Sequence, residues 1–233
     1  MNTLDFDRYK IITFDCYGTL IDWESGMLGV LKPLLANHGI DIKDEEILQK
    51  FAEFESKLQQ GEHRKYYDIL KAVVRKFGEE FDFEPSLAEQ NSLPDSIKNW
   101  QPFSDTVEAL RLLKNKFELG IISNIDDDLF ADSAKLLEVE FDYIITAQQV
   151  KSYKPSLNNF KYAIAQIEFP AEQIIHAACS VYHDLVPANS LELTTVWINR
   201  RANKPGSGAA LPATARADLE VVDLQTLASL SSK

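Results

Sequence analysis

Asp15 stands at the end of an apolar run and opens the string DCYGTL (residues 15–20). A buried strand that stops on a carboxylate fixes that group, and a turn at Gly18 leaves room for a substrate in front of it. Thr19 supplies a hydroxyl to the same carboxylate. Such an aspartate can attack carbon or phosphorus and form a covalent intermediate that water then cleaves. From this string alone, an ordinary turn aspartate after a strand is an equally good interpretation.

Three later segments place further polar side chains after strand-like runs. They contribute Ser123 and Asn124, Lys154 with the proline that follows it, and His183 with Asp184. In a parallel sheet the carboxyl ends of the strands share one edge, and ligands bind there. We therefore expect these side chains to converge with Asp15 at that edge.

Short apolar runs recur along the chain and are separated by turn residues. The strand-like runs are 10–14, 119–122, 143–145, 174–178, 194–198 and 219–222. Helical patterns lie between most of them, at 105–116, 127–137, 158–167 and 185–191. This alternation predicts an α/β fold with a parallel sheet covered on both faces by helices.

Residues 21–100 interrupt this alternation. They contain amphipathic helical patterns at 27–37, 44–59, 63–77, 85–91 and 95–100, without a strand pattern. The sequence thus predicts a helical insertion between the first strand and the rest of the sheet. A stretch of small residues at 202–214 predicts a loop. The acidic residues 126–128 predict the first turn of a helix rather than a metal cluster.

In their order and spacing, the segments 15–20, 119–124, 151–155 and 174–184 resemble the four motifs of the haloacid dehalogenase (HAD) superfamily. The resemblance covers nearly the whole chain and is closest to the type II 2-haloacid dehalogenases. The strings DCYGTLIDW and SVYHD are also similar to azetidine-2-carboxylate hydrolase. The resemblance implies a Rossmann-like α/β core of residues 1–20 and 101–233, with a helical cap domain inserted at 21–100. It also implies a hydrolase that converts a haloacid to a hydroxy acid through an aspartyl ester.

The resemblance assigns roles to the motif residues. Asp15 is the expected nucleophile; Thr19 binds it, and the cation of Lys154 keeps it ionised. Asp184, with His183 beside it, is the expected base for the water that hydrolyses the ester. The alternatives are a solvent-facing residue at a helix start for His183 and a helix N-cap for Asp184.

A second set of residues is expected to bind the substrate. Ser123 and Asn124, with the backbone N–H groups near them, suit a substrate carboxylate. Aromatic and polar residues near the two hinges of the insertion could wall an apolar pocket. These wall residues are Tyr17, Trp23, Asn99, Trp100 and Tyr153. The alternatives are helix capping for the first pair and packing between cap and core for the tryptophans.

Two residues distinguish this chain from the phosphatases of the superfamily. Tyr17 stands where those enzymes carry an aspartate that protonates the leaving group, and a departing halide needs no proton. Cys179 stands where they carry a magnesium-binding aspartate, and magnesium prefers oxygen ligands. We therefore predict an enzyme without a metal or other cofactor. A magnesium-dependent phosphatase remains an alternative.

The cap lacks one group that the resemblance implies. The 2-haloacid dehalogenases place an arginine there to receive the halide and the carboxylate, whereas our alignment puts Ala52, Glu53 or Phe54 at that place. Arg64, on the next helix, is a candidate replacement. Opening the ring of azetidine-2-carboxylate would need no such arginine, so that reaction stays an alternative. A third alternative is that the chain is a non-catalytic member of the superfamily that binds a small acid.

The composition of the chain limits the kinds of binding partner that it can have. The 233 residues carry a net charge of −12, and no basic footprint of a nucleic-acid binder is present. The apolar runs are too short to span a membrane. Two cysteines are too few for a disulfide framework, which predicts free thiols and a cytoplasmic protein. The expected partner is a small carboxylic acid, and the resemblance is compatible with a homodimer.

Overall fold

The computed structural model describes residues 4–202, 204 and 206–232 of the chain. In this part, six parallel strands form one sheet in the order β3-β2-β1-β4-β5-β6. They are β1 (Ile11–Phe14), β2 (Glu118–Ser123), β3 (Tyr143–Thr146), β4 (Ile174–Ala178), β5 (Thr194–Ile198) and β6 (Leu219–Val221). All six predicted strands are present, and the predicted α/β class with a parallel sheet is confirmed.

The order of the strands selects one place for a site. From β1 the chain builds the sheet outward through β2 and β3 on one side, and through β4, β5 and β6 on the other. The crevice beyond the carboxyl end of a strand at which this direction reverses is where open α/β sheets bind ligands. Asp15 directly follows β1 and therefore lies at this point.

Helices cover both faces of the sheet because side chains alternate along each strand. Ile12, Phe14 and Ile121 belong to one apolar cluster, which also contains residues of α5 (Thr106–Lys114) and α10 (Leu224–Ser231). Ile11 and Ile122 belong to a second cluster, shared with α8 (Leu157–Gln166) and α9 (Val186–Ser190). The remaining core elements are α6 (Asp127–Leu137), α7 (Ala147–Val150), η1 (Phe6–Arg8), η3 (Ala171–Gln173) and the π-helical turn η4 (Val181–Leu185).

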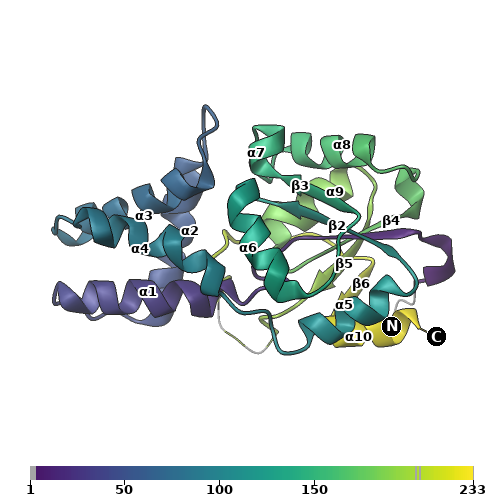
Figure 1. The fold of residues 1–233 in the computed structure, drawn as a ribbon, viewed down its shortest axis with the longest axis horizontal. Coiled ribbons are helices and arrows are strands. Elements are labelled where there is room, and N and C mark those ends of the chain that lie inside the picture. Colours follow the sequence, from purple (N-terminus) through teal and green to yellow (C-terminus); the bar gives the residue numbers. More distant parts are fainter. Residues whose placement is uncertain (1–3, 203, 205, 233) are drawn as a thin grey trace.

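The insertion between β1 and β2 is helical, as predicted. It contains α1 (Trp23–Asn37), α2 (Asp44–Leu58), α3 (Tyr66–Phe81), α4 (Leu87–Ser96) and η2 (Ile97–Asn99). Figure 1 shows α1 to α4 gathered beside the sheet. The two connections to this insertion run side by side, because Asp22 N–H donates to Gln101 O and Phe103 N–H donates to Leu20 O.

Several boundaries differ from the prediction for identifiable reasons. The third helix of the insertion begins at Tyr66 rather than at 63, where the N–H groups of Tyr66 and Tyr67 donate to the Asp126 carboxylate. The fourth begins after a capping box formed by Ser86 and Glu89 and continues to Ser96. The segment predicted as one helix at 185–191 is the turn η4 followed by α9. Helices α7 and α10 were not predicted.

The C-terminal part of the chain also reaches the insertion. Within the predicted loop 202–214, residues 203 and 205 lie outside the described residues. Just before it, Arg201 forms ion pairs with Glu24 of α1 and Glu45 of α2, and Ala209 N–H donates to Glu24. No helix in the described part of the chain has the length and apolarity needed to cross a membrane.

Candidate active site

Asp15 is held in a tight turn directly after β1. The N–H groups of Leu20 and Ile21 both donate to Cys16 O, and Thr19 Oγ1 donates to Asp15 Oδ2 at 2.7 Å. Gly18 makes the turn possible because its φ of +95° lies in the left-handed region, and a Cβ there would sit 2.8 Å from the Trp23 indole nitrogen. The turn therefore orients the carboxylate of Asp15, which is 7% exposed.

Lys154 joins two carboxylates from different parts of the sheet edge. Its Nζ donates to Asp15 Oδ1 at 2.9 Å, to Asp184 Oδ1 at 2.6 Å and to Ile122 O at 2.7 Å. All three ammonium hydrogens thus have acceptors, which is necessary for a lysine that is only 1% exposed. The predicted convergence of Asp15, Lys154 and Asp184 is present in the structure.

Charge pairing opposes burial throughout this cluster. Burial disfavours charged Lys154, but the carboxylates of Asp15 and Asp184 outweigh it and raise the lysine's pKa. Burial alone would raise the pKa of Asp184, but the charge of Lys154 and a hydrogen bond from His176 outweigh burial and lower that pKa. Burial raises the pKa of Asp15, against the opposing effects of Lys154 and Thr19. Lys154 is therefore a cation, and Asp184 is an ionised carboxylate.

Asp184 has one oxygen engaged and one available. Oδ1 is bound by Lys154 and lies 3.0 Å from His176 Nε2, whereas Oδ2 is buried and has no hydrogen-bond partner among the described residues. An unpaired buried carboxylate oxygen is costly unless water or a ligand satisfies it. The geometry therefore leaves one place at which Asp184 could bind a water molecule.

His183 lies next to Asp184 but is tied to its own turn. Its N–H donates to Ser180 Oγ at 3.1 Å, and its Nδ1 lies 3.2 Å from the same oxygen. Burial lowers the pKa of His183 to about 4, so its ring is neutral at neutral pH. His183 is thus a partly buried, uncharged residue and not a solvent-facing one.

Ser123 and Asn124, predicted as a pair, have different surroundings. Ser123 ends β2 two residues beyond Ile121, which pairs with Phe14, and its buried Oγ has no hydrogen-bond partner in the described structure. Asn124 Nδ2 donates to Lys154 O, and its Oδ1 accepts from Lys154 N–H. Both ends of the Asn124 side chain hold the lysine loop, whereas the Ser123 hydroxyl has no partner among the described residues.

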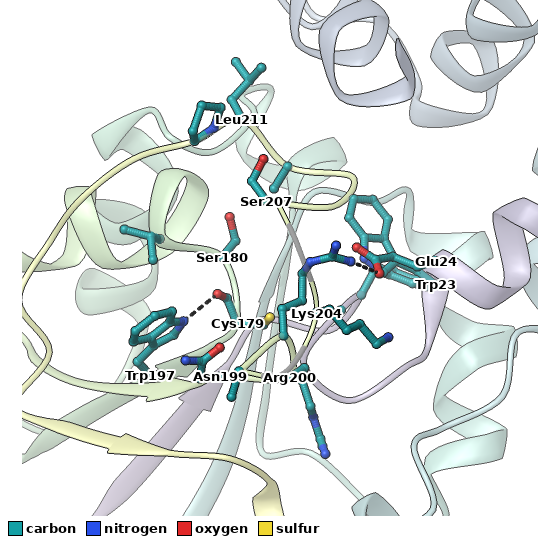
Figure 2. Close-up of a pocket in the computed structure, with 18 of the residues that line it drawn as sticks. Trp23, Glu24, Cys179, Ser180, Trp197, Asn199, Arg200, Lys204, Ser207 and Leu211 are labelled. Atoms are coloured by element: carbon teal, nitrogen blue, oxygen red, sulfur yellow. Dashed lines mark hydrogen bonds and ion pairs between the residues drawn. The ribbon is translucent and has the colours of Figure 1, made fainter. Parts of the chain in front are cut away.

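A cavity of about 640 Å³ lies between the turns at residues 17–18 and 179–181, the start of α1 and the C-terminal loop, and Asp15, Lys154 and Asp184 are not among its lining residues. Figure 2 shows Trp23, Ser180 and Trp197 around it, with the Arg200 side chain directed away. Tyr17 and Trp23, two of the predicted wall residues, line this cavity. Trp197 also lines the cavity and its indole donates to Cys179 O, but no sequence motif points to this residue.

The other predicted wall residues lie elsewhere. Trp100 is buried and packs edge-on against Tyr17, with ring centroids 5.9 Å apart. Asn99 is exposed, and neither residue lines the cavity. Trp100 therefore matches the packing alternative. Tyr153 Oη donates to the backbone carbonyl of Arg64, so it also joins cap and core. The Arg64 guanidinium is exposed and donates to Leu58 O.

The donor set does not fit magnesium. No three histidine, cysteine, aspartate or glutamate side chains gather suitably for a metal ion among the residues described. Lys154 already binds an oxygen of each carboxylate, and Cys179 offers sulfur where oxygen is preferred. Burial raises the pKa of the Cys179 thiol to about 12, which keeps it neutral. Asp127 and Asp128 lie in the first turn of α6, as predicted.

Fold and site together define an α/β protein with a parallel sheet and a buried aspartate directly beyond the first strand. A family model of the haloacid dehalogenase-like hydrolases matches residues 9–177, so the chain belongs to that family. An (S)-2-haloacid dehalogenase of Pseudomonas fluorescens is 26% identical over 203 residues, covering 81% of this chain and 83% of that one. A glyceraldehyde 3-phosphate phosphatase of Methanocaldococcus jannaschii is 27% identical and covers 59% of this chain and 60% of that one. The L-2-haloacid dehalogenase structure from Xanthobacter autotrophicus superposes with a TM-score of 0.80 at 16% identity, covering 96% and 98% of the two chains.

These comparisons confirm the predicted family, fold class and hydrolase activity. The dehalogenase match spans more of both chains than the phosphatase match, which favours the 2-haloacid dehalogenase type over the phosphatase alternative. The roles of the individual side chains remain predictions, and so does the division into residues 1–20 with 101–233 and residues 21–100.

Proposed function

We propose that this hydrolase cleaves the carbon–halogen bond of a small 2-haloacid through an ester on Asp15. The observation that carries the proposal is the arrangement of the two buried carboxylates. Both oxygens of Asp15 are oriented by Thr19 and Lys154, while Asp184 keeps one oxygen without a partner in the described structure. One carboxylate suits attack on a substrate and the other suits activation of water.

In the first step, an Asp15 oxygen attacks the carbon that bears the halogen. The new carbon–oxygen bond forms as the carbon–halogen bond breaks, and the halide leaves with the electron pair. Ser123 Oγ would bind the substrate carboxylate, since it is the buried hydroxyl without a partner in the described part of this sheet edge. Tyr17 and Trp23 would form the apolar wall. We assign Asn124 to holding Lys154 rather than to binding substrate.

In the second step, water attacks the acyl carbon of the Asp15 ester. Asp184 Oδ2 takes a proton from the water, the bond between the acyl carbon and the alcohol oxygen breaks, and the proton passes to the departing alkoxide. The products are the 2-hydroxy acid and the Asp15 carboxyl group, which now contains one oxygen atom from water and returns to the carboxylate by releasing the second water proton to solvent. His183, being neutral, would serve as a hydrogen-bond partner near this water and not as a base.

The helical insertion is proposed to act as a cap of residues 21–100 that closes over this site. Asp126 and Tyr153 of the core bind backbone groups at residues 64–67 of the insertion, and Arg201 binds Glu24 and Glu45. These contacts support a closed position of the cap. A homodimer and a cytoplasmic location remain proposals from the sequence.

Ring opening of azetidine-2-carboxylate is the second candidate, and Glu55 favours it. Glu55 lies on α2 directly after the positions at which the resemblance places an arginine, and Tyr66 Oη donates to its Oε1. The Tyr66 ring also lies 6.2 Å from that of Tyr153, the residue before Lys154. A buried carboxyl here suits a ring amine better than a halide.

A single turnover in oxygen-18 water tests the proposal. The substrates are (S)-2-chloropropionate, fluoroacetate and azetidine-2-carboxylate, each with and without EDTA. We expect label to enter Asp15 with a haloacid, and EDTA to have no effect. An Asp15→Asn variant should form no ester, whereas the matched control Asp128→Asn, at the exposed start of α6, should behave as wild type. Full activity of Asp15→Asn would refute the nucleophile, and label only with the azetidine would select the second candidate.

A further inference from the structure

His176 is a buried titratable residue for which the motifs provide no role. It is the third residue of β4, inside an otherwise apolar run, and it is fully buried. Its ring is fixed on every side: Nε2 lies 3.0 Å from Asp184 Oδ1, and Nδ1 lies 3.0 Å from Thr13 Oγ1. The ring of Phe160 packs edge-on at 5.0 Å between centroids. Both ring nitrogens of this buried side chain therefore have hydrogen-bond partners, and the orientation of the ring is fixed by them.

The partners of His176 determine where its protons are. An ionised carboxylate only accepts hydrogen bonds, so the contact with Asp184 requires a hydrogen on Nε2. Thr13 Oγ1 is also 3.1 Å from Ile175 O, an acceptor. The hydroxyl of Thr13 can therefore donate to Nδ1 of a neutral ring, or donate to Ile175 O and accept from Nδ1–H of a charged one. In either state, Nε2–H points at Asp184.

Few charged groups lie near His176. Asp184 contacts the ring directly, and Lys154 binds the same Oδ1 atom. Asp15 lies beyond the lysine. The other neighbours, Thr13 on β1, Phe160 on α8 and Thr195 in register on β5, are neutral. His176 and Lys154 thus hold Oδ1 from two directions, and only Oδ2 is left for another ligand.

We propose that His176 is the positioning residue of the hydrolytic step: by donating to Asp184 Oδ1 it holds Oδ2 toward the attacking water. This inference rests on the proposed function, since it concerns hydrolysis of the Asp15 ester. It assigns His176 no part in formation of that ester. Removing the imidazole leaves Lys154 as the one hydrogen-bond donor to Asp184 in the described structure, and the carboxylate can then rotate about its side-chain torsions.

The test separates the two half-reactions. Wild type, His176→Leu and His176→Gln are mixed with (S)-2-chloropropionate, and chloride release and the mass of the Asp15 peptide are followed by rapid quench. His176→Leu should release the first equivalent of chloride at nearly the wild-type rate. Its steady-state turnover should then fall about tenfold to a hundredfold, part of the usual contribution of a general base, while ester accumulates. His176→Gln, whose amide can donate to Asp184, should recover most of that turnover.

A control variant distinguishes positioning from general damage to the sheet. Thr195 pairs with His176 in register on β5 and is buried, and its Oγ1 binds Asn189 and Asp218 away from the site. Thr195→Val should slow neither half-reaction. The inference is wrong if His176→Leu hydrolyses its ester at the wild-type rate, or if both half-reactions slow together.

A second measurement needs no substrate. Nitrogen-15 NMR of labelled histidine should show His176 with a hydrogen on Nε2, and Asp184→Asn should shift that signal. An unprotonated Nε2 in the wild-type protein would overturn the inference. By contrast, a wild-type enzyme that forms no ester on Asp15, but does show the Nε2 hydrogen coupled to Asp184, would refute the proposed function and leave the positioning contact intact.

Discussion

Replacing Glu55 by glutamine should stabilise the protein in a strongly pH-dependent way. Glu55 is 3% exposed, and in the described structure the one hydrogen bond to its carboxyl group comes from Tyr66 Oη. Burial raises the pKa of Glu55 from 4.5 to about 7, which the bond from Tyr66 only partly opposes. Glutamine has the same shape and can accept the same hydrogen bond, but it does not ionise.

The sign follows from counting protons. Between pH 4.5 and about 7, folded Glu55 keeps its proton while the unfolded chain has lost it, so the free energy of unfolding decreases as the pH rises through this window. Above pH 7 both states are ionised and the loss is complete. At about 1.4 kcal/mol per pH unit, the full difference is about 3 kcal/mol.

Urea unfolding of wild type and Glu55→Gln, at intervals from pH 4.5 to 8.5, measures this difference. The advantage of the variant should be near zero at the acid end and grow to about 3 kcal/mol at pH 8. The control is Glu53→Gln, two residues away on the same helix, where Glu53 is exposed and paired with Lys57. That variant should show no such growth. A Glu55→Gln advantage that stays constant with pH would mean that Glu55 titrates normally, and would refute the reasoning.

Three further predictions concern the site and the cap. Asp184→Asn should form the Asp15 ester but not hydrolyse it, so intact mass spectrometry should detect an adduct; free enzyme after turnover would contradict this. Asp126→Ala should lower the free energy of unfolding, measured in urea, by about 1–3 kcal/mol, because the N–H groups of Tyr66 and Tyr67 lose their acceptor. An unchanged free energy of unfolding would contradict this prediction. Since burial lowers the pKa of His183 to about 4, the limbs of the pH–rate profile between pH 5 and 8 should not move in His183→Gln; a shifted limb would show that His183 titrates there.

The strands and the motif residues could be predicted because their signals are local. A short apolar run ending at a polar turn identifies a strand, and parallel strands end at one edge, so Asp15, Lys154 and Asp184 had to approach each other. Residues whose partners are distant could not be interpreted in this way. His176 reads as part of a core strand until Asp184 is placed beside it. Asn124 reads as a ligand for substrate until the backbone of Lys154 is found to occupy it.

The boundaries of the helical insertion also depend on contacts with distant residues, which local sequence patterns do not reveal. The helical period predicted α3, but its start at Tyr66 depends on Asp126, which is about sixty residues later in the chain and belongs to the core. No sequence pattern marks Glu55 as a buried residue of the predicted helix 44–59. Its burial depends on how α2 packs against α3, where Tyr66 lies. Side chains that join cap and core are therefore determined by the tertiary arrangement, and local sequence patterns do not reveal them.

The two carboxylates are distinguished by access as well as by hydrogen bonding, and this difference argues for an order of events. Asp15 is 7% exposed whereas Asp184 is completely buried. A substrate that enters from the solvent can therefore reach Asp15 first. The unpartnered oxygen of Asp184 is buried, on a residue that Lys154 joins to Asp15. A water bound at Asp184 would be protected from exchange with the substrate, and it would be in place once the ester carbonyl has formed. Under the proposed function, this difference in access is a physical reason for the nucleophile and the base to be different aspartates.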